Sequence, residues 1–190
     1  MLYIFYGVDD FSMHEALERL KGQVGPVDVL DANVTRTQAS SYSPQQLQAQ
    51  CNTVPFLASR RLVIVDGLLA LFEGRRASRT SRGAKDVSSS WLSMAEYIPT
   101  MPPSTDLVLI DGAIGRNNPL LSQLSSLGQA SEFPSLSGSG LNRWIHERAM
   151  AMECTISREG VGLLAKLVGG NLWTINSEIE KLSLYCRDRT

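Results

Sequence analysis

Leu2-Tyr3-Ile4-Phe5-Tyr6-Gly7, residues 2–7, is an apolar run that ends in glycine, and a helical pattern follows it from Phe11 to Val24. In P-loop proteins such a strand–glycine–helix junction reads G-x-x-x-x-G-K-[ST]. Its backbone amides and lysine hold phosphate, and its hydroxyl holds magnesium. The junction here reads Gly7-Val8-Asp9-Asp10-Phe11-Ser12-Met13, with no second glycine, no lysine and two aspartates where an anion would lie. The sequence therefore predicts the fold of a phosphate-binding domain without its phosphate ligands, and we expect no cofactor or metal.

The pattern beyond this junction predicts an α/β fold with a mostly parallel sheet. Strands are expected at Leu2–Tyr6, Leu62–Val65 and Leu107–Ile110, with further candidates at Val27–Leu30 and Ser131–Leu136. Their apolar runs are continuous rather than alternating, which is typical of strands covered by helices on both faces. Helices are expected between them at Phe11–Val24, Pro44–Asn52, Ser90–Ile98 and Pro119–Leu127. Capping boxes over residues 12–15 and 43–46 would begin the first two of these helices.

The composition changes near Pro134–Gly140 (PSLSGSG), which is typical of a linker. Beyond it the apolar spacing predicts three helices, near residues 141–152, 161–168 and 172–182, with Gly169-Gly170 ending the second. We therefore expect two domains, one over residues 1–138 and a small helical one over residues 139–190.

Composition narrows the functional classes. The 190 residues carry a net charge of -1, which argues against bulk affinity for nucleic acid, and the hydrophobic content of 43% is enough for a core. Cys51, Cys154 and Cys186 form no C-x-x-C pair, so a zinc site or a disulfide framework is not expected. No signal peptide and no apolar stretch of about 18 residues is present, so we expect a soluble, cytoplasmic protein.

Two aspartates end predicted strands at the edge where α/β folds bind ligands. Asp66 and Asp111 are each followed by glycine. A magnesium-binding acid of an ATPase would be followed by glutamate, so a turn is the favoured interpretation of Asp66-Gly67. His14 and His146 are far apart in sequence and outside any H-E-x-x-H pattern, so we expect neither to serve as a metal ligand or a base.

A basic segment, Gly74–Lys85 (GRRASRTSRGAK), contains no acidic residue. As a functional element it would be a loop that contacts nucleic-acid phosphates. As a structural element it would be a solvated insertion, which its serines, glycines and low hydrophobicity favour. The DNA contacts that the first interpretation predicts are Arg75, Arg76, Arg79 and Arg82.

The most specific candidate site is the corner Val54-Pro55-Phe56-Leu57. Pro55 cannot continue the helix that begins at Pro44, and it favours an extended conformation for Val54. Phe56 and Leu57 then lie between a helix and a strand. They either fill the core beneath the sheet or form an exposed apolar hook for a partner's groove.

These residues together resemble a known family. The stretch Gln50-Cys51-Asn52-Thr53-Val54-Pro55-Phe56-Leu57-Ala58-Ser59-Arg60-Arg61-Leu62-Val63-Ile64-Val65, the later Gly169-Gly170-Asn171-Leu172 and the run Glu178-Ile179-Glu180-Lys181-Leu182 are similar to the delta subunits of bacterial DNA polymerase III. The resemblance covers the whole chain. It implies the AAA+ fold, with a RecA-like domain followed by a three-helix lid.

The resemblance implies a clamp-loader subunit without catalysis. Delta subunits of this family do not hydrolyse ATP, and three features of the chain agree with this: the missing P-loop lysine, Asp66-Gly67 in place of an Asp-Glu pair, and Trp173 where AAA+ lids often carry an arginine. The alternatives are a nucleotide-hydrolysing AAA+ ATPase with an unusual phosphate loop, or a DNA-binding module that uses the basic segment 74–85.

The resemblance also implies a hook onto the sliding clamp, with Phe56 and Leu57 as anchors beside Val54 and Asn52. The implied partners are the sliding clamp (beta), the gamma/tau and delta prime subunits, and primed DNA through the assembled complex. Family members carry a third, collar domain for pentamer assembly. The sequence stops before it, so we expect a fragment of a longer subunit, monomeric by itself.

Overall fold

The computed structural model describes residues 1–73 and 91–187 of the chain. The chain forms two compact units, Met1–Phe133 and Pro134–Thr190. The domain division proposed after residue 138 falls at the first residue of helix α7 (Gly138–Ala151).

Unit 1 is built around a parallel sheet in the order β2-β3-β4-β1-β5. The strands are β1 (Leu2–Gly7), β2 (Val34–Gln38), β3 (Arg61–Asp66), β4 (Thr105–Asp111) and β5 (Gln129–Phe133). The three central strands carry the predicted apolar runs, and most of their side chains are buried. Tyr6 pairs with Asp111, and Asp66 with Ile110, so these strands end together at one edge of the sheet.

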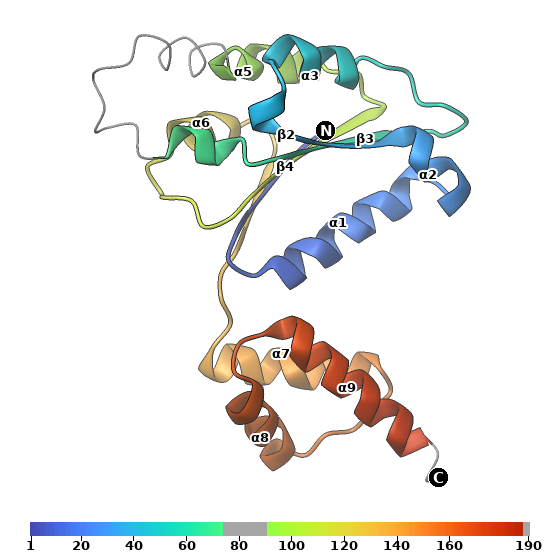
Figure 1. Ribbon diagram of the computed structural model, residues 1–190, viewed down its shortest axis with the longest axis vertical. Coiled ribbons are helices and arrows are strands. Elements are labelled where there is room, and N and C mark those ends of the chain that lie inside the picture. Colours follow the sequence, from blue (N-terminus) through green and yellow to red (C-terminus); the bar gives the residue numbers. More distant parts are fainter. Residues whose placement is uncertain (74–90, 188–190) are drawn as a thin grey trace. The chain divides into compact units, whose positions relative to one another are not determined.

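Helices cover both faces of this sheet, which confirms the α/β class (Figure 1). The α-helices of unit 1 are α1 (Asp10–Val24), α2 (Val27–Asn33), α3 (Pro44–Cys51), α5 (Met94–Tyr97) and α6 (Pro119–Leu124). Short 3-10 helices lie at Ala39–Ser41, Leu69–Phe72 and Ile98–Thr100. One hydrophobic cluster joins α3, α5 and α6 to the sheet through Leu47, Met94 and Leu120. A second packs α1 against the opposite face through Met13 and Leu17.

Two predictions on the second strand and the first cap are wrong. Val27–Leu30 is part of helix α2 rather than a strand, because a short segment with three apolar residues fits either structure, and here Pro26 precedes it as the N-cap residue of the helix. The strand is Val34–Gln38 instead. Helix α1 is capped by Asp9, whose Oδ1 accepts a hydrogen bond from the Ser12 amide at 3.0 Å, so Ser12 lies inside the helix.

The predictions for the start of α3 and for the fifth strand agree with the structure fully and in part, respectively. The capping box of α3 is confirmed, since the Gln46 amide donates to Ser43 Oγ at 3.2 Å and the Ser43 amide donates to Gln46 Oε1 at 2.8 Å. Strand β5 overlaps the predicted Ser131–Leu136 but begins two residues earlier and ends at Phe133, directly before Pro134. Proline has no amide hydrogen, so it cannot extend the ladder with β1.

Unit 2 is the predicted set of three helices, α7, α8 (Arg158–Val168) and α9 (Leu172–Arg187). Their buried faces meet through Leu141, Ile145, Val161, Ile175 and Ile179. The linker is shorter than predicted, because α7 already begins at Gly138. Among the described residues, no helix is long and apolar enough to cross a membrane.

Candidate protein-binding site

At the junction between β1 and α1, where a P-loop would bind phosphate, the backbone amides are bonded to other parts of the chain. The amides of Val8 and Asp9 both donate to the Phe133 carbonyl, at 3.0 and 3.1 Å, and the Gly7 amide donates to Gly112 O at 2.9 Å. A Cβ atom on Gly7 would lie 2.1 Å from the Phe133 oxygen, so β5 itself requires glycine here. The loop amides of Val8 and Asp9 are therefore engaged, and the Asp9 carboxylate caps the start of helix α1.

The two strand-end aspartates are engaged as well. Asp66 accepts two hydrogen bonds from the Arg36 guanidinium, at 2.7 and 2.8 Å. Asp111 is buried and accepts the amides of Leu69 and Ala70, each at 2.9 Å; burial raises the pKa of its carboxyl above the ordinary value. Gly67 has a φ of 76°, which fits the predicted turn.

A metal ion requires a grouping of ligand side chains. Within residues 1–73 and 91–187, which the structure describes, no group of three or more His, Cys, Asp or Glu side chains could hold a metal ion. His14 lies on α1 of unit 1 and His146 on α7 of unit 2, both exposed.

Exposed apolar side chains gather instead after helix α3. We call residues 52–57 the anchor segment. Val54, Phe56 and Leu57 are 80%, 62% and 80% exposed. This exposure contradicts the interpretation in which Phe56 and Leu57 fill the core. In Figure 1 the connection from α3 to β3, which contains this segment, lies at the same end of unit 1 as α2.

The first half of the anchor segment continues the end of α3. The Thr53 hydroxyl donates to Ala49 O at 3.0 Å. Asn52 Oδ1 accepts a hydrogen bond from the Tyr97 hydroxyl at 2.8 Å, which ties the segment to α5. Burial raises the pKa of Tyr97 to about 12, so its hydroxyl stays a donor at neutral pH. Asn52 therefore fixes the start of the anchor segment to α5.

The second half is held by one buried side chain from α2. The Phe56 amide donates to Asn33 Oδ1 at 2.7 Å, and Asn33 Nδ2 donates to the Phe56 carbonyl at 2.7 Å. Asn33 is 0% exposed, and Nδ2 also donates to Val29 O at 2.8 Å. The carboxamide thus pairs with the Phe56 main chain as a neighbouring strand would, and the Phe56 ring is left exposed.

Leu57 follows with an unusual backbone conformation. Its φ is 52°, in the left-handed region that leucine rarely adopts. Such a conformation costs on the order of 1 kcal/mol or more, and persists only where the surroundings fix it. Strain of this kind is concentrated at functional sites, and here it accompanies a side chain that is 80% exposed.

The chain beyond Leu57 is fixed by two arginines. Arg60 donates to both carboxylate oxygens of the buried Asp106, at 2.5 and 2.6 Å. Arg61 is buried and donates to Thr35 Oγ1 at 2.9 Å and to Gln50 Oε1 at 3.2 Å. The anchor segment therefore has its base attached to β2, α3 and β4, while its apolar side chains face outward.

Sequence reasoning located the exposed residues but missed their support. Asn33 was not singled out, because a lone asparagine near the end of a predicted strand carries no functional signal. Its role appears only once α2 and the anchor segment, 23 residues apart in sequence, are in contact. The basic segment with Arg75, Arg76, Arg79 and Arg82 lies outside the described residues, so its proposed DNA contacts stay a prediction.

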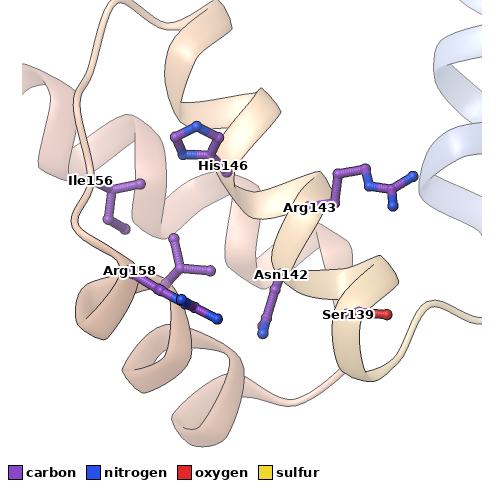
Figure 2. Close-up of a pocket in the computed structure, with 7 residues that line it drawn as sticks. Ser139, Asn142, Arg143, His146, Ile156 and Arg158 are labelled. Atoms are coloured by element: carbon purple, nitrogen blue, oxygen red, sulfur yellow. The ribbon is translucent and has the colours of Figure 1, made fainter.

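A separate pocket of about 400 Å³ lies between α7 and α8 in unit 2. Its lining residues are Ser139, Asn142, Arg143, His146, Ile156, Arg158 and Val161. Figure 2 shows the Arg158 and Asn142 side chains pointing toward each other across it. This lining contains no carboxylate or thiol, and no hydrogen bond joins its Ser139 hydroxyl to His146, so it shows no assembled catalytic group.

The architecture defines the class of protein. A parallel sheet in the order β2-β3-β4-β1-β5, followed by a three-helix unit, is the arrangement of AAA+ proteins. The family model for the DNA polymerase III delta subunit matches residues 3–125, which is more than half of the chain. The chain therefore belongs to the DNA polymerase III delta subunit family.

Individual relatives agree with this assignment. The DNA polymerase III subunit delta of Bacillus subtilis (strain 168) is 25% identical over 190 residues, which are 99% of this chain and 53% of that protein. The solved structure of the Bacillus subtilis DNA clamp loader delta protein (YqeN) matches with a TM-score of 0.76 and 24% identity, over 97% of this chain and 53% of that one. A chain of the E. coli MS115-1 HORMA:CdnC:Trip13 complex shares the fold, with a TM-score of 0.53 and 9% identity over 88% of this chain and 59% of its own. The chain spans about half the length of the curated relative it matches.

Proposed function

We propose that this chain is the part of a clamp-loader delta subunit that binds the replicative sliding clamp and helps to open it. The observation that carries the proposal is the anchor segment, where three exposed apolar side chains extend from a backbone that is hydrogen-bonded from behind. A cluster of exposed large apolar side chains is typical of a protein-binding site. Membership of the delta family makes the sliding clamp the expected partner.

Phe56 and Leu57 would insert into an apolar pocket of the clamp. A large apolar side chain gains about 1.5–3 kcal/mol when it is fully buried, so two such anchors can supply much of an interface's energy. The arginines that follow hold the segment to the sheet, so force applied through the anchors would be transmitted to a rigid domain. A rigid domain behind a tight contact can hold one clamp interface apart.

We further propose that this chain does not bind or hydrolyse nucleotide and that catalysis belongs to other subunits of the polymerase III holoenzyme. The engaged amides of Val8 and Asp9, and the ion pair between Asp66 and Arg36, support this part of the proposal. Gamma/tau, delta prime and primed DNA are the further partners that a delta subunit would meet in the assembled loader.

The test is a direct binding measurement between this chain and the sliding clamp of its own organism. Surface plasmon resonance with immobilised clamp should show saturable, one-site binding that is insensitive to ATP and magnesium. Binding that appears only with ATP would favour the ATPase alternative. Affinity for duplex DNA that falls steeply with salt, without affinity for the clamp, would favour the DNA-binding alternative.

A further inference from the structure

Asn33 is a buried side chain that is bonded to the main chain of an exposed residue. It is 0% exposed, so it cannot touch a partner protein. Yet its carboxamide forms two 2.7 Å hydrogen bonds to Phe56, a residue whose side chain is 62% exposed. One Nδ2 hydrogen donates to Val29 O within the helix, and the contacts with Phe56 take up the other Nδ2 hydrogen and Oδ1.

The contact fixes the conformation at the point where the anchors emerge. With both its N–H and its C=O bound, Phe56 cannot rotate about its backbone without breaking a buried hydrogen bond. Leu57 follows directly, in a left-handed conformation that leucine rarely adopts. Holding such a segment in place before binding removes an ordering cost from the association.

We propose that Asn33 is a positioning residue, whose buried carboxamide holds the Phe56 main chain so that Phe56 and Leu57 are presented to the sliding clamp in their bound conformation. The inference rests on the proposed function of the anchor segment. It adds that affinity depends on a residue that the partner never contacts.

The decisive variant is Asn33→Ala, which removes both hydrogen bonds to Phe56 and keeps the helix propensity of α2 high. We expect the folded variant to bind the clamp roughly tenfold to thirtyfold more weakly, equal to about 1.4–2 kcal/mol, because the backbone of Phe56 must then be ordered on binding. Most of this loss should be visible as a faster dissociation rate.

Asn118 supplies a matched control. It is a second buried asparagine, at 3% exposure, whose side chain donates to Leu69 O at 2.8 Å and accepts the amides of Leu120 and Leu121. Asn118→Ala should lower the melting temperature as Asn33→Ala does, but it should leave the clamp affinity of the folded protein within about twofold. Equal losses of affinity in both variants would mean that general destabilisation is responsible, and would overturn the proposal.

A second comparison tests whether Asn33 affects clamp affinity through Phe56 and Leu57. In a chain that already carries Phe56→Ala and Leu57→Ala, Asn33→Ala should cause no further loss of residual clamp affinity, because it acts through those side chains. An equal loss in both backgrounds would refute a positioning role. If wild-type protein shows no clamp binding at all, the proposed function fails first, and that outcome is distinct from normal binding with an unaffected Asn33→Ala variant.

Hydrogen exchange on the wild-type chain needs no variant. The Phe56 amide lies in an exposed segment but donates to a buried oxygen, so it should exchange at least tenfold more slowly than the neighbouring amide of Val54. Equal exchange rates at the two positions would show that the contact does not hold the segment, and the inference would fail.

Discussion

Replacing Phe56 and Leu57 together by alanine should leave the fold nearly intact. The two residues are 62% and 80% exposed, so 100 − 62 = 38% and 100 − 80 = 20% of their surface is covered by the chain itself. At about 1.5–3 kcal/mol for full burial of such a side chain, these fractions correspond to at most about 1 and about 0.5 kcal/mol of folding free energy. Alanine at position 57 keeps a Cβ, so the strain at φ 52° is unchanged.

The same substitutions should remove most of the clamp affinity. The exposed fractions of the two side chains are what a partner can still bury. Applied to them, the same burial free energy gives a sum of about 2–4 kcal/mol, which is the range of strong interface anchors. That corresponds to roughly 30- to 1000-fold in Kd at about 1.4 kcal/mol per tenfold.

Urea unfolding and surface plasmon resonance on the same protein samples separate the two effects. Leu163→Ala with Leu167→Ala is the matched control, because these α8 leucines are 58% and 74% exposed and lie in the other unit. The control pair should bind the clamp as wild type does. Binding within threefold of wild type by the Phe56 and Leu57 variant would refute the reasoning, as would an equal loss of affinity in the control pair.

Three further outcomes are expected. Isothermal titration with ATP and magnesium should show no binding at micromolar concentration, because the loop amides are already bonded to Phe133; a tight one-to-one site would contradict this. Burial raises the pKa of Cys51 from 9.0 to about 11, so its contribution to stability is complete below pH 9 and is lost as the pH rises toward 11. Urea unfolding across that range should show a loss on the order of 2 kcal/mol that Cys51→Ala lacks; parallel curves would exclude it. Arg60→Met leaves the buried Asp106 without its bidentate partner, and should cost on the order of 2 kcal/mol of unfolding free energy once Arg60's partial exposure is allowed for; an unchanged urea midpoint would speak against it.

Sequence patterns located the central strands of the sheet and overlapped edge strand β5, but they missed edge strand β2. Strands β1, β3 and β4 are buried on both faces, so their residues form the continuous apolar runs that mark such strands. Strand β2 (VTRTQ) is an edge strand with little burial, and its composition resembles that of a loop. The neighbouring segment Val27–Leu30 lies on α2 instead, with Val27 83% exposed, so hydrophobicity alone pointed to the wrong segment.

The sequence indicated where the candidate site lies, but not whether Phe56 and Leu57 are buried or exposed. Pro55 ended the helix, and two apolar residues after it indicated a corner, yet a core plug and an exposed hook contain the same residues. The choice depends on Asn33, which takes up both main-chain groups of Phe56 and leaves its ring facing outward. No local pattern encodes this contact, because it joins two segments that meet only in the folded chain.

The first strand–helix junction shows which protein contacts a bound phosphate would have to displace. A phosphate bound there would have to replace the hydrogen bonds from Val8 and Asp9 to the Phe133 carbonyl and the bond from Ser12 to the Asp9 carboxylate. At about 0.5–1.5 kcal/mol each, these three bonds amount to roughly 1.5–4.5 kcal/mol, before any repulsion between phosphate and Asp9. Gly7 is still required, because β5 approaches it too closely for any side chain. The glycine that suggests a phosphate loop is thus explained by sheet packing, and adding the missing lysine alone would not create a nucleotide site.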